Sequence, residues 1–223
     1  MSDNWDLMNN QTAKASLLEP VCLNEGDIER AAITLSQAFH SNPLIEYFIP
    51  DISKRKDVLP EITKYMVRRG LATGRVYASS DNLEGIAVCV PSERADLSLW
   101  QILRVKGVLL LLLKHAKVFW KLLSYESFAT NIRNRLAPSK HWHLNIIGVD
   151  PQLQGKGHGS ILLKSMLHQI DKEQLPCYLE VHEEKTVVMY RHYGFAVVGT
   201  GVLSGSDVRY WAMLRDVEVN GAS

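Results

Sequence analysis

The sequence predicts an α/β protein of the α+β type, in which a mixed sheet is flanked by helices. Two predicted hairpins, at about 75–91 and 195–214, indicate antiparallel strand pairs. Between them a single strand–helix–strand crossover, at 141–182, requires a parallel pair. Because hairpins and a crossover occur in the same chain, a doubly wound parallel sheet is disfavoured.

The first half of the chain predicts a strand, two helices and a hairpin. A short strand covers Glu19–Leu23, and the first helix then runs from a polar cap to the stop signal Asn42–Pro43. The second helix covers 53–72, where apolar residues recur at helical spacing. "RVYAS" and "GIAVCVP" follow as the two strands of the first hairpin, on either side of a turn signal.

The second half begins with a long helical stretch, 96–136, which is predicted to break near Ser124–Ser127. The later elements are a strand at 141–149, a helix at 159–173, a strand at 176–182, a short helix at 186–194 and the second hairpin. No linker is rich enough in Pro or Gly to separate two domains. We therefore expect a polar, disordered tail at 1–16 and a single domain at 17–216.

Composition and charge exclude several classes of protein. The chain is 46% apolar with a formal net charge of +1, so it can form a core, and no overall field favours nucleic acid. The apolar run Val108–Leu113 is far shorter than the roughly 20 residues of a membrane span. Three scattered cysteines without a CxxC pattern predict free thiols in a reducing compartment, which we take to be the cytoplasm. We expect a monomer or a homodimer.

Three glycines, Gly155, Gly157 and Gly159, lie between the strand at 141–149 and the helix that follows it. Glycine is used this densely where a backbone must approach a ligand closely. The phosphate-binding P-loop requires a glycine where this chain has Asp150, and Ser or Thr after Gly-Lys, where it has Gly157. The segment is therefore not a P-loop.

A dinucleotide-binding turn is a second possibility. Gly155 and Gly157 fit its first two glycines, Ser160 stands in the place of the third, and Glu180 follows at about the right distance. In that motif the glycines come directly after the strand, whereas here "DPQLQ" intervenes. A nicotinamide-binding oxidoreductase stays open as an alternative function.

The third pattern is a strand ending in V-D-P, followed by Q-x-x-G-x-G. "GVDPQL" followed by "QGKGHG" (Gln154–Gly159), with "YLEVHEEKTVVMYRHYGF" (Tyr178–Phe195) downstream, resembles the acyl-CoA loop and second signature of the GNAT acetyltransferase superfamily. The likeness is strong over 141–195 and weaker over 19–90 and 195–216. It leaves 96–136 as a helical insertion outside the common core of the family.

The resemblance implies a mostly antiparallel sheet of about six to seven strands and acetyl-CoA as co-substrate, without a metal. It also implies acetyl transfer to a primary amine of a small molecule or peptide, by direct attack in a ternary complex. Backbone N–H groups of the glycine loop, at a helix N-terminus, suit a pyrophosphate. The expected coenzyme-binding residues are Ile147, Gly148, Val149, Gln154, Gly155, Lys156, Gly157, His158, Gly159, Ser160 and Thr186.

The expected catalytic residues are Tyr190, Glu180 and His143. Tyr190 matches the family tyrosine before G-F, whose phenol can protonate the departing thiolate. Glu180, which matches a glutamate of the family's strand, and His143 are alternative general bases. Backbone N–H groups near Ile147–Val149 would hold the oxyanion, and Gly148 would permit a bulge there.

Two departures from the family pattern favour a further alternative. Related sequences often carry Glu where this chain has Asn145, and Asn where it has Glu183 or Thr186. An amide cannot accept a proton, so a non-catalytic module that binds acyl-CoA stays open. No metal site is expected, because the pair His141 and His143 lacks an evident third ligand.

Overall fold

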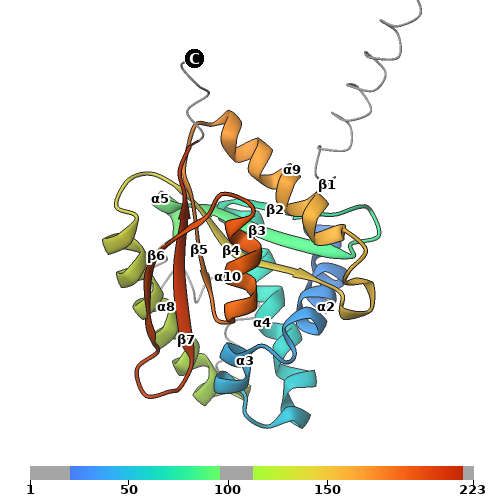
Figure 1. Cartoon of the computed structure of the whole chain (residues 1–223). Helices are drawn as coiled ribbons and strands as arrows, with labels where there is room; N and C mark the ends of the chain where they lie inside the picture. The colour runs from blue at the N-terminus through green and yellow to red at the C-terminus, as the bar shows by residue number, and fades with distance from the viewer. Residues whose placement is uncertain (1–20, 96–112, 218–223) are drawn as a thin grey trace, which may run out of the picture.

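In this computed structural model, residues 21–95 and 113–217 are described, and they form one seven-stranded sheet in the order β1-β2-β3-β4-β5-β7-β6 (Figure 1). The strands are β1 (Val21–Cys22), β2 (Arg75–Ala78), β3 (Gly85–Pro91), β4 (Trp142–Val149), β5 (Cys177–Val181), β6 (Ala196–Val202) and β7 (Arg209–Arg215). Neighbouring strands pair antiparallel except β4 and β5, which are parallel. The predicted mixed, mostly antiparallel sheet of six to seven strands is confirmed.

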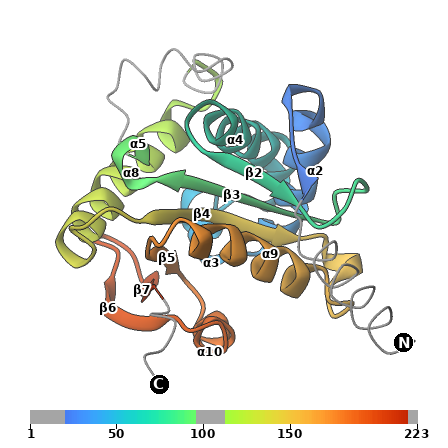
Figure 2. The ribbon, with the colours of Figure 1, turned by 90° about the horizontal axis from the view of Figure 1, so that it is seen from above.

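Helices cover both faces of this sheet. Figure 2 shows α2 and α4 on one side of β2–β4, and α9 on the other. The helices are α2 (Ile28–Phe39), α3 (Pro43–Phe48), α4 (Ile52–Thr73), α5 (Ser92–Ala95), α8 (Ala116–Leu136), α9 (His158–Lys172) and α10 (Glu184–Arg191). The apolar face of α9 packs with Tyr190 and Phe195 against β4 and β5, while α2 and α4 cover the opposite face of β2 and β3. The amphipathic patterns thus bury one stripe of each helix.

A further cluster of buried apolar side chains joins α3, α4 and α8. Phe48, Leu59 and Phe119 meet in this cluster, and the far end of α8 packs through Ile132 against the sheet. The predicted break near Ser124–Ser127 is wrong, since α8 is continuous from Ala116 to Leu136. Serine weakens a helix only slightly, and tertiary packing outweighs that preference.

The helix α3 was not predicted, because Asn42–Pro43 was interpreted only as the end of the preceding helix. In the structure the Asn42 side chain accepts a hydrogen bond from the Leu44 backbone N–H at 3.0 Å, and Pro43 takes the first helical position. The same two residues therefore end one helix and begin another. The expected tail at 1–16 and the part of the helical insertion at 96–112 lie outside the described residues.

The parallel pair β4–β5 is short. Only Trp142 with Cys177 and His143 with Tyr178 are in register, although β4 continues for six further residues. The two strands therefore part beyond His143, and the edge of β4 toward β5 is left free of sheet hydrogen bonds.

The described helices include none long and apolar enough to cross a membrane.

A bulge lies in β4, but not where it was expected. Pairing of β3 with β4 passes from Cys89–Leu144 to Val88–Ile146, so the extra residue is Asn145. Gly148 is in regular register, and the prediction that it would form the bulge is wrong. Glycine is required at this position for packing, because a Cβ on Gly148 would lie 2.7 Å from the Cβ of Ala38.

Candidate active site

The glycine loop connects β4 to the N-terminus of α9. After β4 the Asp150 side chain accepts a hydrogen bond from the Gln152 backbone N–H at 2.9 Å, which forms a single 3-10 turn. Gly155 and Gly157 then adopt φ angles of +77° and +90°, where residues with a Cβ are strained. A Cβ at either position would meet no atom within 4 Å. The glycines are thus required by backbone conformation, and the space beside them is open.

A groove, here called the loop groove, runs along this loop between the end of β4 and α10. Ten of the eleven predicted coenzyme-binding residues line it: Ile147, Gly148, Val149, Gln154, Gly155, Gly157, His158, Gly159, Ser160 and Thr186. Lys156, the eleventh, is exposed and does not belong to the lining. The structure therefore brings residues from two separate sequence motifs to one concave surface.

Side chains of the loop groove hold its walls in place. The Gln154 amide donates to the Val149 carbonyl at 3.1 Å, and the Tyr193 hydroxyl donates to Ser160 Oγ at 3.0 Å. Thr186 Oγ1 donates to the Glu183 carbonyl at 2.6 Å. These three hydrogen bonds fix the shape of the loop groove.

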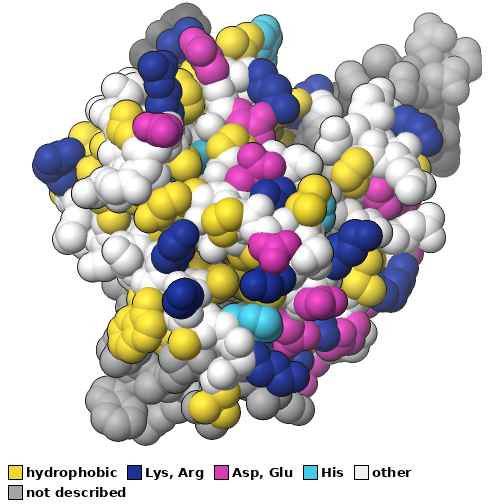
Figure 3. Space-filling view, turned by 90° about the horizontal axis from the view of Figure 1, so that it is seen from below, with side chains coloured by type: hydrophobic (Ala, Val, Ile, Leu, Met, Phe, Trp, Pro, Cys, Tyr) yellow, Lys and Arg dark blue, Asp and Glu magenta, His cyan; other side chains and the backbone are white. Residues whose placement is uncertain are grey.

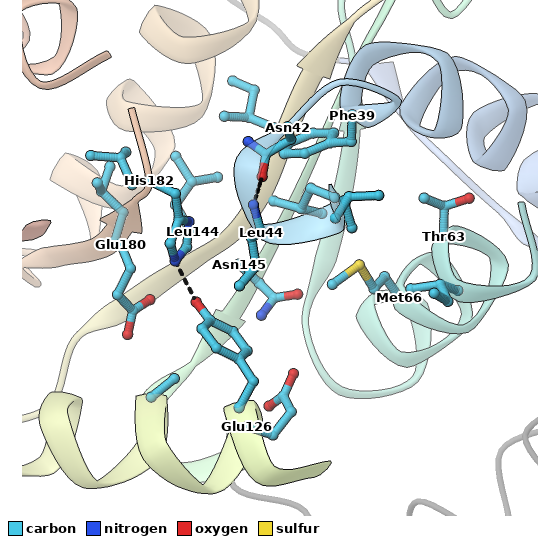
Figure 4. Close-up of a pocket in the computed structure, with 18 of the residues that line it drawn as sticks. Phe39, Asn42, Leu44, Thr63, Met66, Glu126, Leu144, Asn145, Glu180 and His182 are labelled. Carbon is cyan, nitrogen blue, oxygen red and sulfur yellow. Dashed lines mark hydrogen bonds between the residues drawn. The ribbon is translucent and has the colours of Figure 1, made fainter. Parts of the chain in front are cut away.

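A second hollow, here called the inner pocket, lies among α3, α4, α8 and the separated ends of β4 and β5 (Figure 4). It shares six lining residues with the loop groove: Phe39, Asn42, Ile147, Glu183, Thr186 and Tyr190. The two hollows therefore meet where β4 and β5 part. A molecule in one can contact a molecule in the other there.

Tyr190 lies at this junction. Its side chain is buried and packs edge-on against Phe195, with ring centroids 5.5 Å apart. Burial, together with the nearby Cys177 and Cys89 thiols, raises the pKa of the phenol above its ordinary value. Tyr190 is consequently protonated at neutral pH and able to act as a donor.

His143 and Glu180 form a buried pair in the wall of the inner pocket. The Arg133 guanidinium, which can only donate, lies 3.3 Å from His143 Nδ1, so Nδ1 accepts and Nε2 carries the proton. His143 Nε2 then donates to Glu180 Oε2 at 3.0 Å. Burial by itself would raise the pKa of Glu180, but its interactions with His143 and with the Arg133 guanidinium outweigh burial and lower that pKa. Glu180 is thus an ionised carboxylate at neutral pH.

Residues 114–213 match the family model described as acetyltransferase (GNAT) domain. Over these residues the chain is similar to GNAT acetyltransferases. An uncharacterized N-acetyltransferase of Schizosaccharomyces pombe is 28% identical over 179 residues, which cover 76% of this chain and 70% of that protein.

Solved structures share the fold of this chain. One described as histone acetyltransferase HPA2 and related acetyltransferase, from Corynebacterium glutamicum, matches with a TM-score of 0.62 at 16% identity, over 92% of this chain and 98% of its own. The C-terminal condensation domain of Ebony matches with a TM-score of 0.58 at 15% identity, over 89% and 98%. The described strands do not form the doubly wound parallel sheet that the dinucleotide-binding alternative needs.

The polar residues of the inner pocket that were not predicted include His182, Tyr125 and Glu126. The Tyr125 hydroxyl lies 3.1 Å from His182 Nε2, and burial raises the pKa of Tyr125 well above its ordinary value, so Tyr125 donates. Burial lowers the pKa of His182 to about 4, so its imidazole is neutral at pH 7. His182 could have been found, because it lies two residues after Glu180, directly after the end of β5, where strand alternation predicts the same side. Nothing in the local pattern of 96–136 marks Tyr125 or Glu126.

The histidines considered as a metal pair have other partners. His141 Nδ1 lies 2.7 Å from the Ser139 carbonyl, and both nitrogens of His143 are engaged as described above. Within the parts of the chain that the structure describes, no group of three or more His, Cys, Asp or Glu side chains is arranged to hold a metal ion.

Proposed function

We propose that this chain transfers the acetyl group of acetyl-CoA to a primary amine of a small molecule or peptide, by direct attack in a ternary complex. The observation that supports this most is the meeting of the loop groove and the inner pocket beside Tyr190 and Thr186. A donor in the groove and an acceptor in the pocket would then meet end to end. Holding two reactants in this way accelerates a bimolecular step strongly.

The donor is proposed to bind along the glycine loop and the free edge of β4. The backbone N–H groups around Gly155, Gly157 and Gly159 precede a helix of 15 residues, whose N-terminus favours the pyrophosphate anion. Beyond His143, β4 has no partner on its β5 side. Free N–H groups there, near Ile147–Val149, can bind the pantetheine arm and the oxyanion of the tetrahedral intermediate.

The chemical roles follow from protonation states. The amine nitrogen attacks the thioester carbonyl carbon, and the carbon–sulfur bond then breaks. Tyr190 is proposed to give its phenolic proton to the departing thiolate. Glu180, whose pKa is lowered, is proposed to take the proton of the amine through a water, and His143 holds the carboxylate in place.

We also propose that residues 17–216 are one domain and that it works in the cytoplasm on a soluble substrate, as a monomer or homodimer. The single sheet of the described strands supports one domain, and two further observations bear on the compartment and on nucleic acid. Cys22, Cys89 and Cys177 are free thiols. On the face in Figure 3, acidic and basic side chains are interspersed, without the broad basic surface that nucleic-acid binding requires.

The test is release of the coenzyme thiol from acetyl-CoA in the presence of a panel of amines, with calorimetric titration of acetyl-CoA and NADH. We expect acetyl-CoA to bind and at least one amine to be acetylated. Binding of acetyl-CoA without transfer to any amine would support the non-catalytic alternative. Binding of NADH but not acetyl-CoA would contradict the proposal.

A further inference from the structure

The inner pocket has walls that suit an apolar guest. Phe39, Phe48, Ile62 and Met66 line it beside Tyr125, whose ring meets that of Phe48 edge-on, with centroids 5.7 Å apart. Burying apolar surface against such walls contributes about 25 cal/mol per Å². A polyamine or an aminoglycoside would leave many of its polar groups without partners there.

Carboxylates outnumber cations among the described lining residues of this pocket. Glu126, Glu180 and Glu183 contribute to the lining, and its one Arg or Lys side chain is Arg133, which lies against His143 at 3.3 Å. Glu183 is also paired with Lys185 and Glu126 with Arg69, so a cation would be bound by the carboxylate oxygens that face the pocket rather than by its net charge. An α-amino acid, whose carboxylate would be brought near these glutamates, is disfavoured by charge.

Glu126 is a carboxylate of the inner pocket whose orientation is fixed by a buried arginine. It extends from α8, and its Oε2 lies 3.3 Å from Arg69 Nη1. The Arg69 side chain is buried and also donates to the Ala95 carbonyl, so it fixes the orientation of Glu126 from outside the pocket. Figure 4 shows Glu126, Glu180 and Asn145 in the lower half of the view, with Phe39 above and Met66 to one side. Glu126 and Asn145 thus contribute polar atoms below Phe39 in this view.

On the basis of the proposed function, we infer that the acceptor is a primary amine with one positive charge and an apolar body, and that Glu126 is a specificity-determining residue for it. Glu126 attracts the ammonium group, and the apolar walls hold the body of the amine. The predicted substrate class is therefore apolar monoamines rather than polyamines, aminoglycosides or amino acids.

The test compares 2-phenylethylamine with phenylalanine, which differs from it by one carboxylate, and with spermidine and kanamycin. We expect kcat/KM for 2-phenylethylamine to exceed that for each of the others at least about tenfold. In Glu126→Gln, KM for 2-phenylethylamine should rise about tenfold, while kcat and the KM for acetyl-CoA change less than about twofold. The control is Glu46→Gln, since Glu46 pairs with Arg55 at 3.0 Å outside the pocket.

Three outcomes would overturn the inference: spermidine or kanamycin as the better substrate, equal use of phenylalanine, or an unchanged KM in Glu126→Gln. If no amine were acetylated, the proposed function would fail, and calorimetric titration of 2-phenylethylamine into the protein saturated with coenzyme A would decide the inference separately. Binding that is weakened in Glu126→Gln but not in Glu46→Gln supports it, and absence of binding overturns it.

Discussion

At the scale of single residues, Tyr190 is the side chain whose position matters most for the proposed chemistry. It lines both hollows, it is buried, and its phenol keeps its proton at neutral pH. A hydroxyl in this position can reach a thiolate that forms between donor and acceptor. The aromatic ring itself packs against Phe195 and contributes to the core.

Replacing Tyr190 by Phe separates these two roles. The ring and its packing remain, so we expect the melting temperature and the acetyl-CoA dissociation constant to change little. Loss of the proton donor should lower kcat about 100-fold, which is the lower range for general acid catalysis. Steady-state kinetics and calorimetry measure the two effects. The matched control is Tyr210→Phe, which removes a phenol from β7 away from both hollows; a normal kcat in Tyr190→Phe would show that another group is the acid.

The residues that the sequence identified belong to short motifs, whereas Glu126 and Arg69, which it did not identify, lie outside them. Gly155, Gly157 and Tyr190 are recognisable because backbone approach and a short helix before G-F demand particular residues at fixed spacing. Glu126 and Arg69 are 57 positions apart, and only the packing of α4 on α8 brings them together. No periodicity in either helix carries that information.

At the scale of elements, the loop before α9 is the part whose conformation and proposed role can be tested independently. Its two left-handed glycines have a counterpart in Gly205, at φ +74° in the turn between β6 and β7, where an added Cβ also meets no atom within 4 Å. A side chain at either place therefore has a similar backbone cost, roughly 1–2 kcal/mol. Only the loop before α9 lies in the groove.

Substituting Val at Gly157 should raise the acetyl-CoA dissociation constant at least about tenfold, because the side chain would occupy the space proposed for the pyrophosphate. The variant should fold, with a free energy of unfolding lowered by about the same amount as in Gly205→Val. Calorimetric titration and urea denaturation of both variants check this. Equal acetyl-CoA affinity in the two variants would remove the loop from the proposed donor site.

The helices show where local signals are ambiguous. The spacing of apolar residues predicted the extent of α4 and α9 to within one or two residues. The pair Asn42–Pro43 can both end one helix and begin another. Because it was interpreted only as a helix end, α3 was not predicted. In α8, serines near Tyr125 suggested a break, but the contact of Tyr125 with Phe48 helps to hold that turn in the helix.

At the scale of the whole molecule, the sheet consists of two parts joined by two register pairs between β4 and β5. Alternation and turn signals predict each part, since those signals are local. The distance over which two parallel strands stay paired depends on what packs between them. Here the side chains of α3, α4 and α8 reach that space from elsewhere in the chain, so the pocket could not be derived from the strands alone.

Burial of His182 in this pocket makes the stability of the molecule depend on pH. Its folded pKa of about 4 is below the ordinary value of 6.5, so between these values the unfolded chain binds a proton that the folded protein does not. Protonation of His182 therefore does not lower the free energy of unfolding above about pH 6.5. As pH falls toward 4, it lowers that free energy by about 3 kcal/mol. In His182→Gln, where the amide oxygen can still accept from Tyr125, the free energy of unfolding should fall less steeply over this window.

Urea denaturation at pH 7, 6, 5 and 4 measures this slope in the wild type, in His182→Gln and in His168→Gln, the last of which removes an exposed histidine from α9. The control should follow the wild-type curve, because His168 is exposed and does not line the inner pocket. Parallel curves for all three proteins would mean that folding does not lower the pKa of His182. The pocket would then gain a cation beside Glu180 as pH falls below about 6.5, and the attraction proposed there for an amine would be weakened.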